Sequence, residues 1–386
     1  MRDTSRMQAV QPAIVPAIAE LARQTPGTIS LAQGVVWYGP PPAAVEALAG
    51  LRPDPAVHRY GPVTGEPELV EAIEQKLEAD NGIRVGPDRR VVVTAGSNMG
   101  FLNAVLATTH PGDEVILLSP YYFNHDMAIG MAGCRTVKVE TGGNWGPTPS
   151  VIERAIGPTT RAVVTVSPNN PSGAVYDEDC LREINGICER HGIYHINDEA
   201  YEYFTYGAAR HCSPGSRPGS EGHTISLFSF SKTYGMAGWR VGYMLIPEHL
   251  LEAVNKVQDT NLICPTILSQ RLALAALREG SGYCRQKVRE MDEVRKLVVS
   301  ALRALDDDRC RFSEPEGAFY CLLMVGTRLS SITAAERLIR NHRVALVPGS
   351  AFGIDDVCTL RLSFGALDRE TVAEGVGRLV EGIRSF

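Results

Sequence analysis

The sequence has few of the features by which membrane, nucleic-acid-binding and metal-binding proteins are recognised. No stretch approaches the ~20 apolar residues that a membrane-spanning helix requires. No basic block stands out and the net charge is −6, so nucleic acids and membranes are not expected partners. Internal repeats and low-complexity tracts are absent as well. These absences leave a globular protein without a membrane span as the expectation.

The nine cysteines form no recognisable metal or redox motif. Their number is odd, they are widely spaced, and no Cys-x-x-Cys occurs. Reduced thiols in a cytoplasmic protein fit this pattern best. His191 and His195 are four residues apart, but no further ligand accompanies them, so we expect no metal site. Because Pro12 and Pro16 interrupt the first apolar stretch, we also expect no signal peptide.

The hydrophobic content, by contrast, is sufficient for a large core. Of the 386 residues, 44% are hydrophobic and 21% are charged, which is ordinary globular composition. A chain of this length exceeds the usual size of a single core, so two domains are expected. We predict a large domain over residues 45–285 and a small domain made of residues 1–44 and 286–386.

The middle of the chain alternates strand-like apolar runs with helical patterns. The predicted strands are Val91–Thr94, Glu114–Leu118, Arg161–Val166, Gly192–Asn197, Thr224–Phe228 and Arg240–Ile246. The predicted helices between them include Asn98–Thr108 and Asp177–Glu189. Such alternation, with continuous apolar strands, indicates a three-layer α/β fold in which a mostly parallel sheet is covered on both faces. Ligands of such sheets bind at the carboxyl ends of the strands.

The C-terminal part has a pattern that is typical of a smaller α+β domain. A long charged helix is predicted from Gly282 to Leu305, where it would connect the two domains. The elements predicted after it are strands at Ala318–Met324, Val344–Val347 and Thr359–Phe364 and helices at Thr333–Asn341 and Arg369–Ile383.

One lysine has an unusual setting, because it follows a predicted strand and is flanked by hydroxyls and a glycine. The block runs from Ser229 to Gly235 and contains Lys232. A lysine alone is usually a solvated surface residue. A cofactor aldehyde, however, needs a lysine amine, and burial beside cationic groups makes such an amine reactive by lowering its pKa. Ser229, Ser231 and Arg240 are residue types that would hold a cofactor phosphate.

Three further blocks carry polar residues after predicted strands. Asp198 and Tyr201 follow one strand, where a carboxylate can pair with a pyridinium nitrogen and keep the ring an electron sink. Asp198 alone could equally be a helix N-cap. Asn170 lies in a proline-rich segment that by composition is simply a loop. Ser97 and Asn98 open a predicted helix, where free backbone N–H groups can hold a phosphate.

Together the four blocks resemble the fold-type-I aminotransferases of class I/II, a family that includes aspartate, aromatic and kynurenine aminotransferases and uses pyridoxal 5'-phosphate. The blocks occur in the family's order, and the resemblance covers nearly the whole chain. Additional matching blocks are Ala32–Gly34, Arg59–Gly65, Pro120–Tyr122, Pro315–Tyr320, Val347–Gly353 and Leu360–Phe364. The lysine block and the Asp-x-x-Tyr block are highly specific, whereas the glycine turn is not.

The resemblance implies roles for the residues around the cofactor ring. Lys232 corresponds to the lysine that forms the Schiff base and shuttles protons. Asp198 corresponds to the partner of the pyridine nitrogen, and His125 to a histidine that supports that aspartate. Tyr122 lies where the family stacks an aromatic ring on the cofactor.

The phenolic oxygen and the phosphate of the cofactor have implied ligands as well. Asn170 and Tyr201 correspond to the ligands of the phenolic oxygen. The implied phosphate ligands are Ser97, Asn98, Ser229, Ser231 and Arg240. Tyr60 is similar to a tyrosine that reaches the phosphate from the neighbouring subunit, which implies a homodimer with shared active sites.

The implied substrate site includes one departure from the family. Arg361 resembles the arginine that holds the substrate carboxylate through a bidentate pair, and Gly34 lies where the backbone approaches the substrate. The family often shows Gly-x-Pro-x-Phe here, whereas this chain carries Trp37 and Tyr38, which either line the pocket or pack in the core. If these two side chains line the pocket, neutral, aromatic or sulfur-containing amino acids are favoured as substrates. Because no second arginine for a side-chain carboxylate can be identified, strict specificity for aspartate is not expected.

The resemblance implies a cytoplasmic enzyme that moves an amino group from an L-amino acid to a 2-oxo acid with ping-pong kinetics. Because fold and cofactor do not fix the reaction, a C–S β-lyase and another tailoring enzyme for a special amino acid stay open as alternatives. A ligand-sensing regulator would need a DNA-binding domain, for which 386 residues leave no room. An inactive homologue would be expected to lack Lys232 or Asp198, and both are present.

Overall fold

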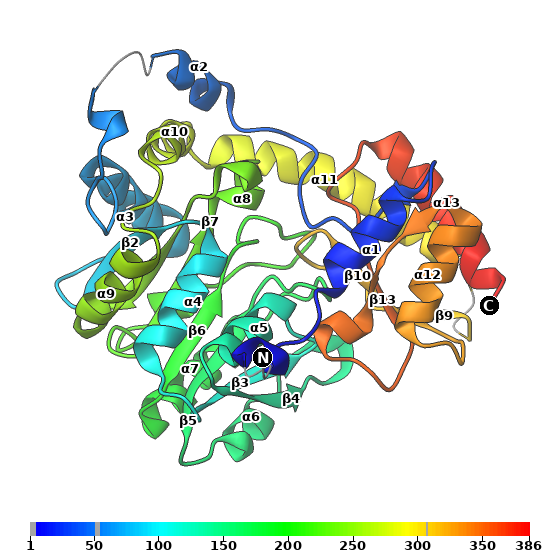
Figure 1. Ribbon diagram of the computed structural model, residues 1–386, viewed down its shortest axis with the longest axis horizontal. Coiled ribbons are helices and arrows are strands. Elements are labelled where there is room, and N and C mark those ends of the chain that lie inside the picture. The colour runs from blue at the N-terminus through cyan, green and yellow to red at the C-terminus, as the bar shows by residue number, and fades with distance from the viewer. Residues whose placement is uncertain (1–4, 51–54, 306–307) are drawn as a thin grey trace.

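A seven-stranded sheet dominates the computed structural model, which describes residues 5–50, 55–305 and 308–386 (Figure 1). The strand order is β2-β8-β7-β6-β5-β3-β4. Strand β8 runs antiparallel to both of its neighbours, and all other adjacent pairs are parallel. The strands are β2 (Arg89–Thr94), β3 (Glu114–Ser119), β4 (Arg135–Glu140), β5 (Thr160–Val166), β6 (Tyr194–Asp198), β7 (Thr224–Ser229) and β8 (Gly242–Pro247). The mostly parallel sheet expected from the sequence is therefore confirmed.

Both faces of this sheet are covered by helices because alternate side chains of each strand point to opposite sides. In β3, Val115 and Leu117 pack in a cluster with α4 (Ser97–Thr108), α5 (Phe123–Met131) and α9 (Leu251–Asn261). Ile116 and Leu118 pack in another cluster with α6 (Pro149–Ala155) and α7 (Glu178–His191). Further helices at the β2 side are α2 (Pro42–Gly50), α3 (Pro67–Asn81) and α10 (Ile267–Arg278). Continuous apolar strands thus form the middle layer of a three-layer structure.

Helix ends in this layer follow local chemistry. The carboxylate of Asp177 accepts a hydrogen bond from the backbone N–H of Cys180 at 2.8 Å and so caps the N-terminus of α7. The helix stops at Gly192, whose φ of 63° is left-handed and suits glycine. The chain then enters β6, which ends at Asp198. The cap at Asp177 and the stop at Gly192 thus set the length of α7, and the strand that follows places Asp198 at the carboxyl edge of the sheet.

A second, smaller sheet has the order β12-β13-β10-β9, and all its adjacent pairs are antiparallel. Its strands are β9 (Cys310–Phe312), β10 (Tyr320–Val325), β12 (Val347–Pro348) and β13 (Thr359–Ser363). Helices α12 (Ser331–His342) and α13 (Arg369–Arg384) pack beside it, together with α1 (Ile14–Arg23) from the N-terminal segment. Strand β1 (Ile29–Ser30) pairs with β11 (Val344–Ala345) and attaches that segment to this part of the molecule.

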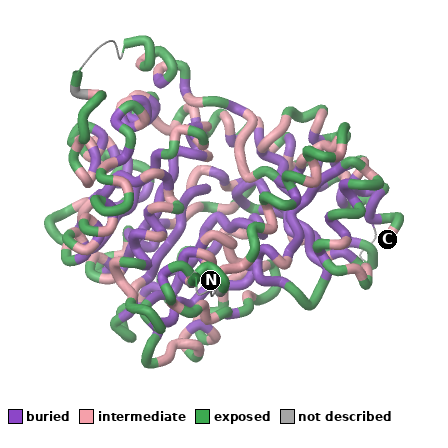
Figure 2. The backbone as a smooth tube through the Cα atoms, in the orientation of Figure 1, coloured by how far each residue is buried: buried purple, intermediate pink, exposed green. Residues whose placement is uncertain are grey.

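Helix α11 (Ser281–Leu302) runs between the two sheets and belongs to two hydrophobic clusters (Figure 1). Cys284 packs with residues of α3 and α10, whereas Val288, Met291 and Val294 pack with the smaller sheet. In Figure 2 buried backbone follows the strands of both sheets, which shows the core passing through the region between them. No helix in the described ranges is long and apolar enough to cross a membrane.

Candidate active site

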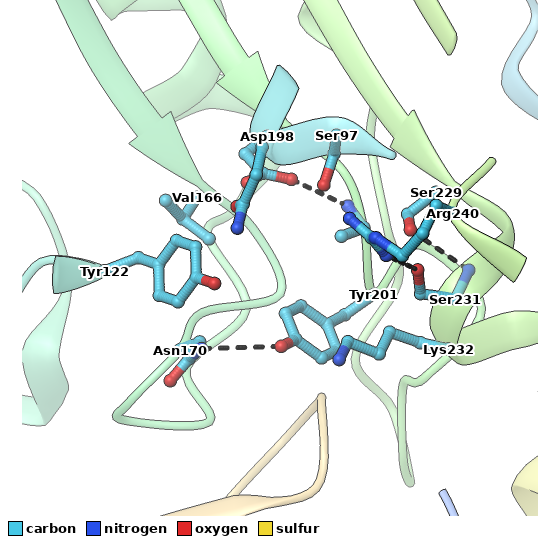
Figure 3. Close-up of a pocket in the computed structure, with 12 residues that line it drawn as sticks. Ser97, Tyr122, Val166, Asn170, Asp198, Tyr201, Ser229, Ser231, Lys232 and Arg240 are labelled. Carbon is cyan, nitrogen blue, oxygen red and sulfur yellow. Dashed lines mark hydrogen bonds between the residues drawn. The ribbon is translucent and has the colours of Figure 1, made fainter. Parts of the chain in front are cut away.

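One pocket at the carboxyl edge of the large sheet collects most of the residues that the sequence had singled out (Figure 3). Its lining comprises Ser97, Asn98, Tyr122, Val166, Asn170, Asp198, Ala200, Tyr201, Ser229, Ser231, Lys232 and Arg240. The sequence analysis had assigned roles to all of these except Val166 and Ala200, whose small apolar side chains carry no chemical signal. They meet here because the carboxyl ends of β5, β6 and β7 lie along the same edge of the sheet.

Lys232 is held in the pocket by hydrogen bonds at both ends of the residue. The Ser229 hydroxyl accepts from the backbone N–H of Ser231 at 3.1 Å and so caps the short helix α8 (Phe230–Thr233). The amine of Lys232 donates to the backbone carbonyl of Gly34, and the Tyr38 hydroxyl donates to the backbone carbonyl of Lys232 at 3.1 Å. These contacts tie the lysine to the N-terminal segment.

The pKa of the Lys232 amine is lowered to about 8, chiefly by burial. The positive charges of Arg361 and Arg240 lower this pKa further, while the carboxylate of Asp198 acts in the opposite direction. A substantial fraction of the lysine is therefore the neutral amine at neutral to mildly alkaline pH. Only that form has a lone pair with which to attack an aldehyde or take a proton.

Asp198 is the last residue of β6 and is 4% exposed. One carboxylate oxygen lies 3.2 Å from Nε2 of His125, and the other accepts from the backbone N–H of Ala200 at 3.1 Å. The His125 ring stacks on Phe101, with 4.0 Å between the ring centroids. Asp198 is thus fixed at a strand end and does not cap a helix, which was the other interpretation that its sequence allowed.

Two further side chains of the pocket are oriented by amides. The Tyr201 hydroxyl accepts from Nδ2 of Asn170 at 3.4 Å, and both residues are buried. The hydroxyl of Tyr122 accepts from Nδ2 of Asn124 at 2.8 Å, and its ring meets His125 edge to face at 5.2 Å. Figure 3 shows the Tyr122 ring projecting into the pocket from the side opposite Lys232.

The end of the pocket that is formed by the start of α4 and by Arg240 is rich in hydrogen-bond donors. Ser97 begins α4, so backbone N–H groups at this helix start lack partners within the helix. Arg240 has a left-handed φ of 53°, and its guanidinium lies 3.5 Å from the Ser231 hydroxyl. Gly96 has a φ of 83°, a conformation that favours glycine, and a Cβ atom there would lie 2.5 Å from that guanidinium and displace it. Donors of this kind are arranged as they are in phosphate sites.

Arg361, in β13, is 2% exposed and lies beside the pocket. It donates to the side-chain oxygen of Asn170 at 3.0 Å and to the backbone oxygen of Ala32 at 2.7 Å. Its Nε has no hydrogen-bond partner, and no carboxylate in the described ranges forms an ion pair with it. A buried cation without a counter-charge is costly, so this position favours an anion.

Five residues to which the sequence analysis gave roles lie outside this pocket lining: Arg361 and His125, described above, and Tyr60, Trp37 and Gly34. Tyr60 is 78% exposed on the surface of the single chain. Trp37 is partly buried, meets Tyr38 edge to face at 5.2 Å and packs against the core that includes the smaller sheet. Gly34 contributes its backbone carbonyl to Lys232, as described above.

Comparison with known proteins identifies the family. Residues 26–379 match the family model of aminotransferase class I and II. The chain belongs to this family. The aminotransferase is 37% identical to the aromatic aminotransferase ISS1 of Arabidopsis thaliana, over 97% of this chain and 94% of that protein. It is 35% identical to the aspartate/prephenate aminotransferase of Thermus thermophilus, over 91% of this chain and 92% of that protein.

The aminotransferase also resembles solved structures over its full length. The aromatic aminotransferase from Pyrococcus horikoshii superposes with a TM-score of 0.87 at 32% identity, covering 95% of this chain and 99% of that structure. These relatives confirm the predicted family, the fold-type-I architecture and the reaction class. Members of the family depend on pyridoxal phosphate, so the chain is a pyridoxal-phosphate-dependent aminotransferase.

The donor set of the pocket fits this cofactor. A lysine amine of lowered pKa suits its aldehyde, and the buried carboxylate of Asp198 suits a protonated pyridine nitrogen. Hydroxyls, helix N–H groups and Arg240 suit the phosphate. The pocket thus offers a complementary group for the aldehyde, for the ring nitrogen and for the phosphate of the cofactor.

One residue that sequence reasoning did not assign is Tyr320, which lies behind the pocket against Tyr201 and Arg361. It ends the matching block Pro315–Tyr320, so a signal was present, but nothing in that block identifies which side chains it meets.

Proposed function

We propose that this aminotransferase acts on neutral and aromatic L-amino acids, sulfur-containing ones included, with Lys232 as the residue that carries the cofactor. The observation that supports these assignments is the shared pocket, in which Lys232 has a pKa of about 8 and Asp198 is buried. Pyridoxal phosphate, when bound, supplies an aldehyde that accepts the amino group and a ring that withdraws electrons from the substrate α-carbon.

In this proposal the side chains of the pocket hold and move protons at defined atoms. The neutral amine of Lys232 takes the α-proton of the substrate and later returns a proton. The carboxylate of Asp198 keeps a positive charge on the ring nitrogen, and His125 fixes that carboxylate through its 3.2 Å contact. Asn170 and Tyr201 would donate to the phenolic oxygen of the cofactor, and the Tyr122 ring would provide an aromatic surface for it.

At the two ends of the pocket, the proposed roles are to hold anions. The phosphate is held by Ser97, Asn98, Ser229, Ser231 and Arg240. Arg361 takes the substrate carboxylate, because its guanidinium is buried and has no acidic partner among the described residues. Gly34 allows the backbone to approach the substrate, and Trp37 lies on the side of the N-terminal segment.

The proposed substrate class rests on charge. Lys232 and Arg240 are the only cationic side chains in the described lining, and Arg361 lies beside it. With these three committed to the aldehyde, the phosphate and the α-carboxylate, no cation is left in the described lining for a second carboxylate. Apolar and aromatic side chains are therefore favoured over acidic ones, in line with the name of the relative from Arabidopsis thaliana.

We further propose a cytoplasmic homodimer in which Tyr60 reaches the phosphate end of the partner's pocket. In the single chain Tyr60 is 78% exposed, and the exposed apolar residues Val45, Leu48, Ile263 and Leu268 come from neighbouring elements. Such a patch is typical of a protein interface. The nine free cysteines agree with a reducing compartment. The domains proposed are residues 45–285 and residues 1–44 with 286–386.

A panel assay tests the reaction and its substrates. Purified enzyme is given each amino acid with several 2-oxo acids, and new amino acid is measured against pyruvate plus ammonia. We expect new amino acid with neutral and aromatic donors and little with aspartate. Release of pyruvate and ammonia without a new amino acid would instead indicate β-elimination.

Two lysine variants test the assignment of Lys232. Wild type should carry a visible absorption band that borohydride bleaches, and Lys232→Ala should lack it. Lys256→Ala serves as the matched control, because Lys256 lies on the surface of α9 with 73% of its side chain exposed. A bleachable band that survives in Lys232→Ala would contradict the assignment.

A further inference from the structure

Tyr320 is not part of the pocket lining, yet it contacts two side chains that act there. It begins β10 and is completely buried. Its hydroxyl lies 2.8 Å from the hydroxyl of Tyr201, and its ring lies 4.5 Å from the guanidinium carbon of Arg361. Asn170 contacts Tyr201 at 3.4 Å with its amide nitrogen and Arg361 at 3.0 Å with its amide oxygen. The four side chains therefore form a closed ring of contacts.

The strand register explains why Tyr320 and Arg361 meet. In the antiparallel pair of β10 and β13, Tyr320 lies opposite Ser363 and Arg361 lies opposite Leu322. Tyr320 and Arg361 are therefore diagonal neighbours on one face of the sheet, a spacing that aromatic and long side chains can span. Because the guanidinium lies over the ring, the Tyr320 ring faces the charge that this position otherwise leaves unpaired.

The backbone of the N-terminal segment closes on the other side of Tyr320. A Cβ atom at Gly34 would lie 2.7 Å from the Tyr320 hydroxyl, so a larger residue could not approach this closely. The same Gly34 carbonyl accepts from the amine of Lys232. Tyr320 is thus enclosed between the residue that binds Lys232 and the ring of contacts that holds Arg361.

The hydrogen bond between the two tyrosines has a direction that matters for chemistry. Burial raises the pKa of Tyr320 to about 12 and the pKa of Tyr201 well above its usual value, so both hydroxyls keep their protons at neutral pH. A hydroxyl has one proton and two acceptor positions. The amide of Asn170 already donates to the Tyr201 oxygen. Either tyrosine hydroxyl can be the donor across their 2.8 Å contact. In the arrangement in which Tyr320 donates, both acceptor positions of Tyr201 are filled, and the Tyr201 proton is free to be donated to a group in the pocket.

We propose that Tyr320 is a positioning residue with two roles. Its hydroxyl directs the Tyr201 proton toward the phenolic oxygen of the cofactor, and its ring holds the Arg361 guanidinium in place for the substrate carboxylate. The inference rests on the roles proposed above for Tyr201 and Arg361. It adds that one side chain serves both ends of the reacting centre through two separable groups.

Two substitutions separate the hydroxyl from the ring. Tyr320→Phe keeps the ring and removes the hydroxyl. The visible absorption of the cofactor-loaded enzyme is expected to change with pH, and this variant should raise the midpoint of that change by roughly 0.5–1 pH unit. The direction follows because a hydrogen bond to the phenolic oxygen favours its deprotonated form. The KM for the amino acid should change by less than about twofold in this variant. Tyr320→Leu removes the ring as well and should raise this KM roughly tenfold.

A double-mutant cycle tests whether Tyr320 acts through Tyr201. Tyr201→Phe should raise the midpoint, and Tyr320→Phe in that background should add no further shift. The control is Tyr206→Phe, because Tyr206 is a buried tyrosine outside the pocket whose hydroxyl donates to the carbonyl of Ala318 at 2.6 Å. That variant loses a buried hydrogen bond too, yet its midpoint should equal that of the wild type.

The outcomes distinguish the two levels of the proposal. A wild-type protein without a pH-dependent cofactor band would overturn both the proposed roles and this inference. A wild-type band whose midpoint is unchanged in Tyr320→Phe, or additive shifts in the cycle, would overturn the inference alone. Because Tyr320→Leu leaves a cavity, the KM of this variant tests the role of the ring only if the variant protein unfolds cooperatively on heating. The titration of Tyr320→Phe and the double-mutant cycle decide the role of the hydroxyl in either case.

Discussion

The lowered pKa of Lys232 predicts how the enzyme without cofactor reacts. With a pKa of about 8 in place of the ordinary lysine pKa of 10.5, the amine at pH 7 is neutral about 300 times more often than an ordinary lysine. Only the neutral amine is nucleophilic. The rate at which a small amine-reactive reagent acylates Lys232, and the rate at which Lys232 captures the cofactor, should therefore rise with pH and level off above about pH 8. An ordinary lysine would continue to gain reactivity up to about pH 10.

The same reasoning predicts the effect of a neighbouring charge. Arg361 is the first cation among the causes of the lowered pKa, after burial. Arg361→Met removes that cation and should move the inflection to higher pH, because the protonated amine is no longer repelled. At pH 7 the reaction of Lys232 should therefore slow in this variant.

The assay follows the acylated Lys232 peptide by mass spectrometry from pH 6 to 10, with Lys232→Ala used to identify that peptide. Cofactor capture, followed by absorbance, gives a second measurement of the same inflection. An inflection near pH 10 in the wild type would refute the argument from burial. An inflection that Arg361→Met does not move would refute the argument from charge.

Three further predictions follow from single side chains. Burial lowers the pKa of His195 to about 3, so below about pH 6.5 the unfolded chain binds a proton that the folded chain does not. The free energy of unfolding, measured in urea, should therefore be lower at pH 5 than at neutral pH by ~2 kcal/mol. His195→Gln should reduce this dependence on pH. Gly96→Ala introduces a side chain at a φ of 83° and against Arg240, so it should weaken cofactor binding about tenfold or more in a fluorescence titration. Arg361→Lys keeps the charge but loses the planar donor pair, so the KM for the amino acid should rise about 10- to 100-fold while the cofactor absorption is retained.

The sequence predicted the central strands well because hydrophobicity alone specifies them. The predicted strands and helices occur with ends that differ by at most about three residues, except that the run Val344–Val347 is divided between β11 and β12, which belong to different sheets. Strand β4 was not predicted, because Arg135–Glu140 alternates charged and apolar residues at the edge of the sheet and is only partly buried. Helix α3 was missed for a similar reason, since its sequence is dominated by polar residues and its packing against β2 is a tertiary effect.

The pocket residues were predictable where the chemistry is local to a strand end. Lys232, Asp198 and Asn170 each follow a predicted strand, and parallel strands bring such residues to one edge. Tyr320 could not be assigned in this way, because its role depends on the register between β10 and β13 and on the close approach of Gly34. The spacing of residues in a motif predicts neither the pairing of two distant strands nor a close contact with the backbone.

The charges of the site explain why cofactor and substrate fit together. Lys232, Arg240 and Arg361 are three cations gathered around one buried carboxylate, Asp198. The protein alone leaves this excess of positive charge uncompensated. The cost in free energy falls chiefly on Arg361, which is buried, whereas Arg240 is exposed in the single chain. In the roles proposed for Arg240 and Arg361, a phosphate and a carboxylate would supply the missing negative charge at opposite ends of the site. Binding of each anion should therefore stabilise the fold as well as orient the reactants, and it should change the pKa of Lys232, which lies between them.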